Sequence, residues 1–324
     1  MDDLEQERVK RKDGWERELL EKLAMASIIE QRRSRRWGIF FKLLTFTYLV
    51  ILLLLWLPDS LTGDAMTTTK EHTALVEING VIADDSDASA DNVVTALRSA
   101  YKDKKTKGVV LRINSPGGSA VQAGYINDEI KRLKAKHPKI PVYAVVTDMA
   151  ASGGYYIAVA ADEIYVDKAS IVGSIGVLMS TFGFERGMEK LGVERRLLTA
   201  GEHKGILDPF SPLKTEEKQH VQEMLDQVHQ QFIQAVKDGR GERLKERDDI
   251  FSGLFWSGEE SIKLGLADGL GSSSYVAREL IGAENLVDYT RSEDLLERFA
   301  KRIGAGAAAF VSSRVGLGID PAIR

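Results

Sequence analysis

Residues 148–156 read Asp-Met-Ala-Ala-Ser-Gly-Gly-Tyr-Tyr, and this segment decides the interpretation of the fold. It follows an apolar stretch, residues 141–146, with the length and β-branched content of a buried strand. A stretch of small residues, 153–161, then predicts a short helix. Ser152 therefore stands at a strand-to-helix junction where small neighbours leave its hydroxyl open to a substrate carbonyl. The alternative is that Ser152 only caps the helix, and that the two glycines allow close helix packing.

The sequence on both sides of this segment alternates short apolar stretches with helical patterns. Strands are predicted at residues 74–78, 108–113, 141–146, 163–166 and 193–198, and helices at residues 121–136, 153–161 and 215–237. Strands that alternate with helices predict an α/β domain with a largely parallel sheet. Because sites in such sheets lie at the carboxyl ends of the strands, the loops after the strands are the candidate functional segments.

The loop at residues 114–119 reads Asn-Ser-Pro-Gly-Gly-Ser and follows the strand at 108–113. Two glycines let the backbone approach a bound group closely and turn amide hydrogens toward it. The partial positive charge of a helix N-terminus adds to this effect. Together these features suit an oxyanion hole, which stabilises the negative charge on an attacked carbonyl oxygen. A tight turn followed by a helix cap would have the same sequence.

The loop at residues 200–205 reads Ala-Gly-Glu-His-Lys-Gly and follows the strand predicted at 193–198. A serine hydroxyl becomes a good nucleophile only when a base removes its proton. Lys204 is a candidate base, because burial away from water favours the uncharged form of an amine. His203 is the rival base, and an ordinary surface lysine is the other reading of Lys204. If all three loops share one sheet end, Ser152 and Lys204 should meet there.

Composition excludes several classes of function. The chain has 324 residues, of which 44% are hydrophobic and 28% charged, as expected for a folded protein. A net charge of −4 argues against a nucleic-acid partner. The absence of cysteine excludes disulfides, thiolate nucleophiles and cysteine-bound zinc, and the five histidines form no metal-binding motif. We therefore expect neither a metal nor a cofactor.

The N-terminal part of the chain predicts a membrane anchor. Four arginines at positions 32, 33, 35 and 36 precede an apolar stretch, residues 37–57, that is just long enough to cross a bilayer core. Arginines on that flank place the N-terminus in the cytoplasm and the rest of the chain on the other side. A cleaved signal peptide is the alternative. We expect a charged cytoplasmic segment at 1–37, an anchor at 38–57, a linker at 58–72, a globular domain at 73–289 and a C-terminal tail at 290–324.

Several motifs, taken together, resemble the signal peptide peptidase group of peptidase family S49. The opening strand at 76–82, the core motifs at 114–118, 149–156 and 172–177, and the late signature at 256–258 and 264–268 carry the resemblance, which covers roughly residues 74–270. It implies the fold of the Clp protease and crotonase superfamily. The segment before the anchor has no counterpart in the family core.

The resemblance also implies roles for individual residues. Ser152 falls on the nucleophile and Lys204 on the base of a Ser/Lys dyad, while Ser174 falls on a serine that helps to hold the lysine. We expect the amides of Gly118 and Gly153 to form the oxyanion hole.

For the whole protein, the resemblance implies a homo-oligomer, an octamer for chains of this length, whose sites combine groups from adjacent subunits. It also implies cleavage of remnant signal peptides and other hydrophobic or unfolded segments at the outer face of the bacterial inner membrane. The alternatives are a protease of this family with a specific membrane-protein client, an acyl-CoA enzyme of the crotonase type, and a membrane scaffold without catalysis.

Overall fold

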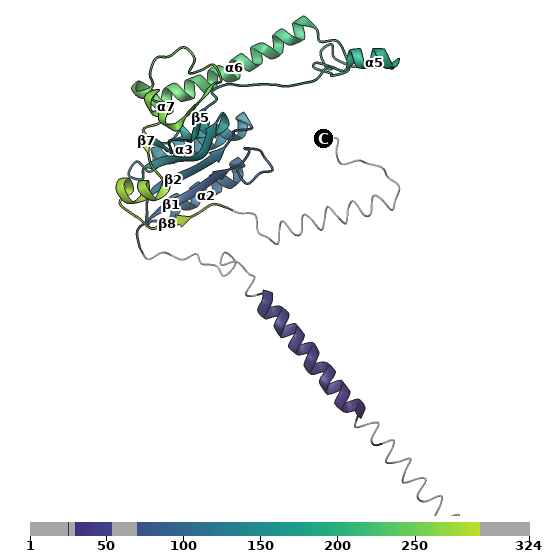
Figure 1. The fold of residues 1–324 in the computed structure, drawn as a ribbon, viewed down its shortest axis with the longest axis vertical. Coiled ribbons are helices and arrows are strands. Elements are labelled where there is room, and N and C mark those ends of the chain that lie inside the picture. The colour runs from purple at the N-terminus through teal and green to yellow at the C-terminus, as the bar shows by residue number, and fades with distance from the viewer. Residues whose placement is uncertain (1–24, 26–29, 54–69, 292–324) are drawn as a thin grey trace, which may run out of the picture. The chain divides into compact units, whose positions relative to one another are not determined.

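The computed structural model describes residue 25, residues 30–53 and residues 70–291, and the chain divides into two compact units, Met1–Thr67 and Thr68–Arg324. Figure 1 draws both units. The described part of the first unit is essentially one helix, Glu30–Leu53. The second unit contains all of the strands among the described residues.

The helix Glu30–Leu53 has 24 residues, a mean hydropathy of 1.6 in its most apolar window, and no side chain buried there. At 1.5 Å per residue it is about 36 Å long, more than the roughly 30 Å of a bilayer core. By length and composition it can therefore cross a membrane. The predicted anchor at 38–57 begins within this helix, and its last four residues lie outside the described part of the chain.

The second unit is built on an eight-stranded sheet in the order β6-β5-β3-β2-β1-β8, with β4 paired to β3 and β7 paired to β4. The strands are β1 His72–Asn79, β2 Thr106–Ser115, β3 Val142–Ala151, β4 Glu163–Val166, β5 Ile171–Gly173, β6 Phe255–Ser257, β7 Gly269–Leu270 and β8 Leu286–Asp288. All pairs are parallel except β5 with β6. The predicted α/β class with a largely parallel sheet is confirmed.

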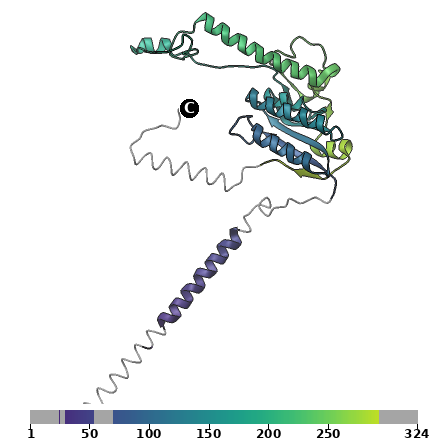
Figure 2. The same cartoon turned by 180° about the vertical axis from the view of Figure 1, so that it is seen from behind.

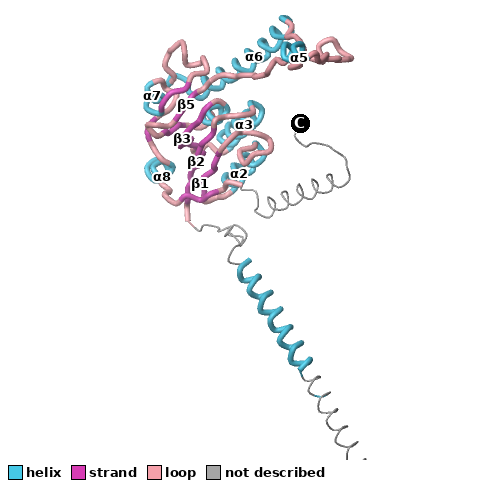
Figure 3. Tube along the Cα trace, turned by 45° about the vertical axis from the view of Figure 1, so that its right-hand side comes forward, coloured by secondary structure: helices cyan, strands magenta, loops and turns pink. Residues whose placement is uncertain are grey.

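Helices cover the sheet unequally. Helices α2 Ala90–Lys102, α3 Ala120–Lys136 and α4 Gly153–Ala158 lie over one face, where alternate strand residues such as Leu111 and Ala144 are fully buried beneath them. The other face is covered only in part, by α8 Ser273–Tyr275 and the π-helix η2 Val276–Ile281, which pack on a smaller apolar cluster. Figure 3 shows α2 and α3 on one side of the strands and α8 on the other.

Residues 177–217 form an arm that leads away from the sheet, and Figures 1 and 2 show α5 at its far end. The arm contains α5 Glu185–Leu191 and the first turn of α6 Thr215–Arg240. Helix α6 then returns to the sheet, where its C-terminal half buries Phe232 and Val236 in the main core. The predicted helix at 215–237 is therefore present, and it connects the arm to the domain.

The prediction of a strand at residues 193–198 is wrong. These residues form no ladder, and Val193, Leu197 and Leu198 are exposed. An apolar stretch forms a strand only where another strand can pair with its backbone, and no strand of the described sheet runs beside the arm. Lys204 consequently does not follow a strand.

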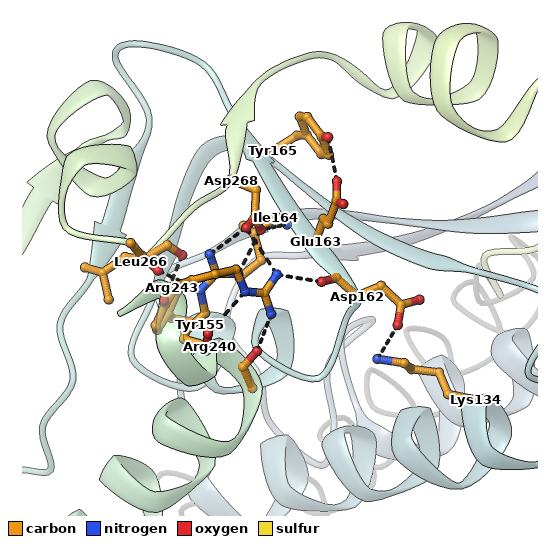
Figure 4. A network of polar contacts seen from close by, with 12 residues as sticks. Lys134, Tyr155, Asp162, Glu163, Ile164, Tyr165, Arg240, Arg243, Leu266 and Asp268 are labelled. Carbon is orange, nitrogen blue, oxygen red and sulfur yellow. Dashed lines mark hydrogen bonds and ion pairs between the residues drawn. The ribbon is translucent and has the colours of Figure 1, made fainter. Parts of the chain in front are cut away.

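An ion-pair network fixes the end of α6 to the sheet (Figure 4). Arg240 is only 2% exposed, and its guanidinium donates to both carboxylate oxygens of Asp268, at 2.8 and 2.9 Å, and to the Gly265 carbonyl. Arg243 donates to the same carboxylate at 3.1 Å. The Ile164 amide of β4 also donates to Asp268, so the carboxylate links α6 directly to the sheet.

The same network explains the titration of Asp268. Burial by itself raises the pKa of Asp268, but the hydrogen bonds and charge of Arg240 outweigh it, helped by the Ile164 amide and Arg243, so the net pKa is lowered. The buried carboxylate is therefore held in its charged form.

Candidate active site

Ser152 lies between β3 and α4 in a strained backbone conformation. Its φ of 52° and ψ of −122° lie in a region that L-residues rarely adopt. Its amide donates to the Gly173 carbonyl at 2.9 Å, which ties the junction to β5. The side chain makes no capping hydrogen bond to α4, so the interpretation of Ser152 as a simple helix cap is not what the structure shows. Strain of this kind occurs where a structure holds a side chain in place for function.

The Gly117–Gly118 turn packs directly against the Ser152 junction. A Cβ added at Gly117, whose φ is 99°, would lie 2.7 Å from both the Gly153 nitrogen and the Ser152 Cβ. Only glycine allows this approach of the two loops. The alternative interpretation of residues 114–119 also holds in part, because Ser119 caps α3 by accepting from the Gln122 amide at 3.3 Å.

Two backbone amides lie close to Ser152. Gly153 is the first residue of α4, so its amide has no acceptor within the helix. The bridge between Ile82 and Gly118 uses the Gly117 carbonyl and the Ser119 amide, and so does not occupy the Gly118 amide. The Gly118 nitrogen lies 3.4 Å from where a Cβ of Gly153 would stand. The two glycines predicted for an oxyanion hole are thus neighbours.

Ser174 lies directly after β5, the strand that pairs with the end of β3 before Ser152. It has a φ of 53° and donates its amide to the Leu254 carbonyl at 2.7 Å. Because Ala151 pairs with Gly173 in the β3–β5 ladder, the residues that follow each of them are brought side by side. Ser152 and Ser174 therefore share one end of the sheet.

A pocket of about 580 Å³ opens at this point. It is lined by Ser152, Gly153, Ser174, Gly118 and Pro116, by Ala120 and Ala123 of α3, by Tyr156 of α4, by Val228, Gln231 and Phe232 of α6, and by Gly176, Val177, Leu178, Ser252 and Gly253. Most of these residues are apolar or glycine, and Ser152, Ser174, Ser252 and Gln231 add polar groups to the wall. The sequence predicted a helix at 215–237. It did not show that Val228, Gln231 and Phe232 of this helix would line the pocket of Ser152, because that depends on how the helix packs on the domain.

Lys204 does not line that pocket. It lies in a series of turns on the arm, where its amide donates to the Gly201 carbonyl at 3.2 Å. The neighbouring His203 lies 4.0 Å from the carboxylate of Glu217, in the first turn of α6. Along the helix, Glu217 is 11 residues from Val228, the first residue of α6 in the pocket, which is about 17 Å at 1.5 Å per residue. One chain thus brings together Ser152, Ser174, Gly118 and Gly153, but not Lys204 or His203.

The turns that carry Lys204 are held by local contacts. Asp208 accepts from the Ser211 hydroxyl at 2.6 Å and from Arg195 at 3.4 Å. The Ser211 hydrogen bond is the largest contribution that lowers the pKa of Asp208, and the charge of Arg195 adds to it. The Arg195 guanidinium lies 5.6 Å from the centre of the Phe210 ring, which stacks on Phe184. The arm therefore presents Lys204 from a defined local structure.

The arm also exposes many large apolar side chains. They include Leu178, Met179, Phe182, Phe184, Leu191, Val193, Leu197, Leu198, Phe210 and Leu213, of which Leu198 is 95% exposed. Large apolar side chains exposed together on one segment point to a site of interaction with protein or membrane.

Family models match most of the second unit. Residues 134–286 match the model described as peptidase family S49, and residues 65–184 match the one described as ClpP-like SDH-type serine proteinase. The second match overlaps the strands and loops that carry Ser152 and Gly118.

Individual relatives share the same part of the chain. A Synechocystis sp. protein named "Putative protease" is 33% identical over 64% of this chain and 72% of its own length. Protease 4 of Haemophilus influenzae is 34% identical over 66% of this chain and 35% of its own length. A Brucella melitensis protein named Na(+)/H(+) antiporter NhaA is 47% identical over 57% of this chain, which spans only 25% of that protein.

Proposed function

The chain belongs to peptidase family S49 and is a serine peptidase, and from this premise we propose that it is a membrane-anchored endopeptidase with a Ser152/Lys204 dyad. The observation that carries the proposal is the strained backbone of Ser152. Its side chain makes no capping hydrogen bond to α4 and lines a pocket beside Gly118 and Gly153. A peptide carbonyl bound there would meet a nucleophile and two donors at once.

The chemistry follows from the roles of these groups. The uncharged Lys204 amine takes the proton of the Ser152 hydroxyl as its oxygen attacks the peptide carbonyl. The Gly118 and Gly153 amides donate to the oxygen that becomes negative. The Lys204 ammonium then returns the proton to the leaving amine, and an acyl-enzyme on Ser152 remains. Water, deprotonated by the same amine, attacks the acyl carbonyl, and the Lys204 ammonium returns the proton to the Ser152 oxygen as the bond to the acyl group breaks. Ser174 orients Lys204 throughout.

We propose that the lysine comes from a neighbouring copy of the chain. Lys204 does not line its own chain's pocket, and Glu217, which lies beside its neighbour His203, is about 17 Å along α6 from Val228 in that pocket. A closed dyad therefore needs another arm. The exposed apolar side chains of the arm supply the surface for that contact. A ring in which each arm reaches the next pocket meets both requirements, and an octamer is the ring size that the family resemblance implies.

The proposal is tested by labelling the full-length protein with a serine-reactive fluorophosphonate and by measuring peptide cleavage. We expect Ser152→Ala to abolish both labelling and cleavage, and Lys204→Ala to reduce cleavage by at least about a thousandfold. His203→Ala is the matched control on the same turn and should keep most of the activity. A Lys204→Ala enzyme with near-full activity would refute the assignment of the base.

We propose that the helix Glu30–Leu53 anchors the enzyme in the bacterial inner membrane, with the domain at 73–289 on the outer side. The four arginines at its N-terminal end support this orientation. Remnant signal peptides and other apolar segments in the same membrane are the proposed substrates, since tethering raises their effective concentration. The apolar walls of the pocket, including Tyr156, Val228 and Phe232, suit such side chains.

A second candidate is a protease with one specific membrane-protein client. The Brucella relative supports it, because a chain named as a cation antiporter contains a segment similar to this peptidase. Reconstitution of the enzyme with an antiporter of that type, and separately with a remnant signal peptide, distinguishes the two functions. Cleavage or stable binding of the antiporter in preference to the peptide would favour the specific client.

A further inference from the structure

Strand β3 changes its partner where the candidate active site begins. Residues 143–146 pair with β4, whereas residues 149–151 pair with β5. On its other side, the register with β2 steps from Ile113 opposite Val146 to Ser115 opposite Ala150. Asn114 alone therefore faces residues 147–149, and the regular ladder between β2 and β3 is interrupted at this bulge.

A side-chain hydrogen bond crosses the interruption. The Asn114 amide Nδ2 donates to Asp148 Oδ2 at 2.9 Å. Both residues lie near the carboxyl ends of their strands, Asn114 in β2 four residues before Gly118 and Asp148 in β3 four residues before Ser152. The bond thus joins the strand that leads to one proposed oxyanion donor to the strand that leads to the nucleophile and the other donor.

We propose that Asn114 and Asp148 form a positioning pair that sets the separation of the Gly118 and Ser152 loops. The inference rests on the proposed function, in which both loops act on one carbonyl. An oxyanion hole works only when its donors lie about 2.7–3.1 Å from the developing oxyanion. Misplacement by about 1 Å can cost about a hundredfold in rate. Where the backbone ladder is interrupted, this bond holds that distance together with the Thr147 hydroxyl, which donates to the Ile113 carbonyl at 3.3 Å.

The position of the pair separates this role from substrate binding and from folding. Neither residue lines the pocket of Ser152, and Asp148 lines a separate pocket with Arg112 and Ser273. We therefore expect the bound segment not to contact the pair. The hydrogen bond is exposed to solvent, and exposed polar pairs contribute little to stability. Loss of the bond should therefore lower kcat and leave KM and the unfolding midpoint nearly unchanged.

The test uses the full-length enzyme, four variants and peptide-cleavage kinetics. We expect Asn114→Ala and Asp148→Ala each to lower kcat about tenfold or more. Asn114→Asp should be slower still, because two carboxylates would face each other. The exchange variant Asn114→Asp/Asp148→Asn restores one amide donor and one carboxylate acceptor, and should recover kcat to within about threefold of the natural enzyme.

Arg278→Ala is the control, because it removes another exposed side-chain hydrogen bond, the one to Glu279 within η2, outside the lining of the Ser152 pocket, and should leave kcat unchanged. An active natural enzyme and an inactive Ser152→Ala variant establish the proposed function first. With those two results in hand, single variants within about twofold of the natural kcat would overturn the positioning role. An exchange variant as slow as Asn114→Asp, or losses confined to KM, would overturn it as well.

Discussion

At position 152 a serine occupies a backbone conformation with positive φ, which glycine adopts without strain. The conformation costs about 1–3 kcal/mol, and the hydrogen bond that the Ser152 amide donates to the Gly173 carbonyl keeps it in place. As a result, the hydroxyl does not cap α4, and Ser152 lines the pocket. Ser174 has the same sign of φ one strand away, so both serines of the candidate site occupy strained positions.

This strain predicts that replacing Ser152 by glycine raises the stability of the protein while abolishing its activity. Ser152→Gly should raise the stability of the purified full chain by about 1 kcal/mol, since strain relief exceeds the entropy that glycine loses on folding. Ser152→Ala keeps the strain and should unfold at about the natural midpoint. Both variants should be inactive. Thermal unfolding of the three proteins checks this, and a Ser152→Gly variant less stable than Ser152→Ala would show that the conformation is not strained.

At the scale of elements, the sequence predicted the central strands and the two long helices, because apolar periodicity identifies elements of that length. The strand at 163–166 matches β4, and helix α3 begins one residue before its predicted start. The strands β6, β7 and β8 have three residues or fewer, which is too short to carry a periodic signal. Helix α2 was not predicted.

The prediction of a strand at 193–198 failed for a different reason. An apolar stretch that is exposed in one chain, such as residues 193–198, has the same sequence pattern as a buried strand. The same error placed Lys204 at the sheet end beside Ser152. The segments of Ser152 and Gly118 were predicted to follow strands, and both do, whereas the strand before Ser174, β5, was not predicted.

Helix α6 depends on the ion pair that fixes its end. Arg240→Ala would leave Asp268 buried with only Arg243 as a charged partner, and we expect a loss of about 3 kcal/mol in the free energy of unfolding. Arg247→Ala, which breaks an exposed pair with Asp249, is the control and should cost less than about 1 kcal/mol. Chemical denaturation measures both, and equal effects would contradict the account.

The same pair predicts a dependence of stability on pH. The pKa of Asp268 is lower in the folded state than the ordinary value of 3.8, so its contribution is present above that value and is lost as the pH falls through the folded-state pKa. Asp268→Asn should flatten the acid limb of the stability curve.

At the scale of the whole molecule, the arm has two tasks. It carries Lys204 away from its own pocket, and it exposes apolar side chains that one chain leaves uncovered. Both features are explained if the arm of one copy packs on the next and completes its site. Assembly would then be a condition of catalysis, and an isolated chain would be inactive.

A charge on the arm should therefore disrupt both assembly and activity. Leu198→Asp places a carboxylate on a side chain that is 95% exposed in one chain, so it should not affect folding. Val121→Asp, on the exposed face of α3, is the matched control and should keep the natural mass. Light scattering after size exclusion measures the mass, and a Leu198→Asp protein that stays assembled and active would remove the arm from the interface.

Co-assembly of two inactive proteins tests the shared dyad most directly. Ser152→Ala supplies a lysine without a nucleophile, and Lys204→Ala supplies a nucleophile without a base. In randomly mixed rings of equal parts, a Lys204→Ala copy followed by a Ser152→Ala copy makes one intact site, so about one quarter of the natural activity should return. Mixed assemblies with no activity, beside an active natural ring, would mean that the nucleophile and the base belong to one chain.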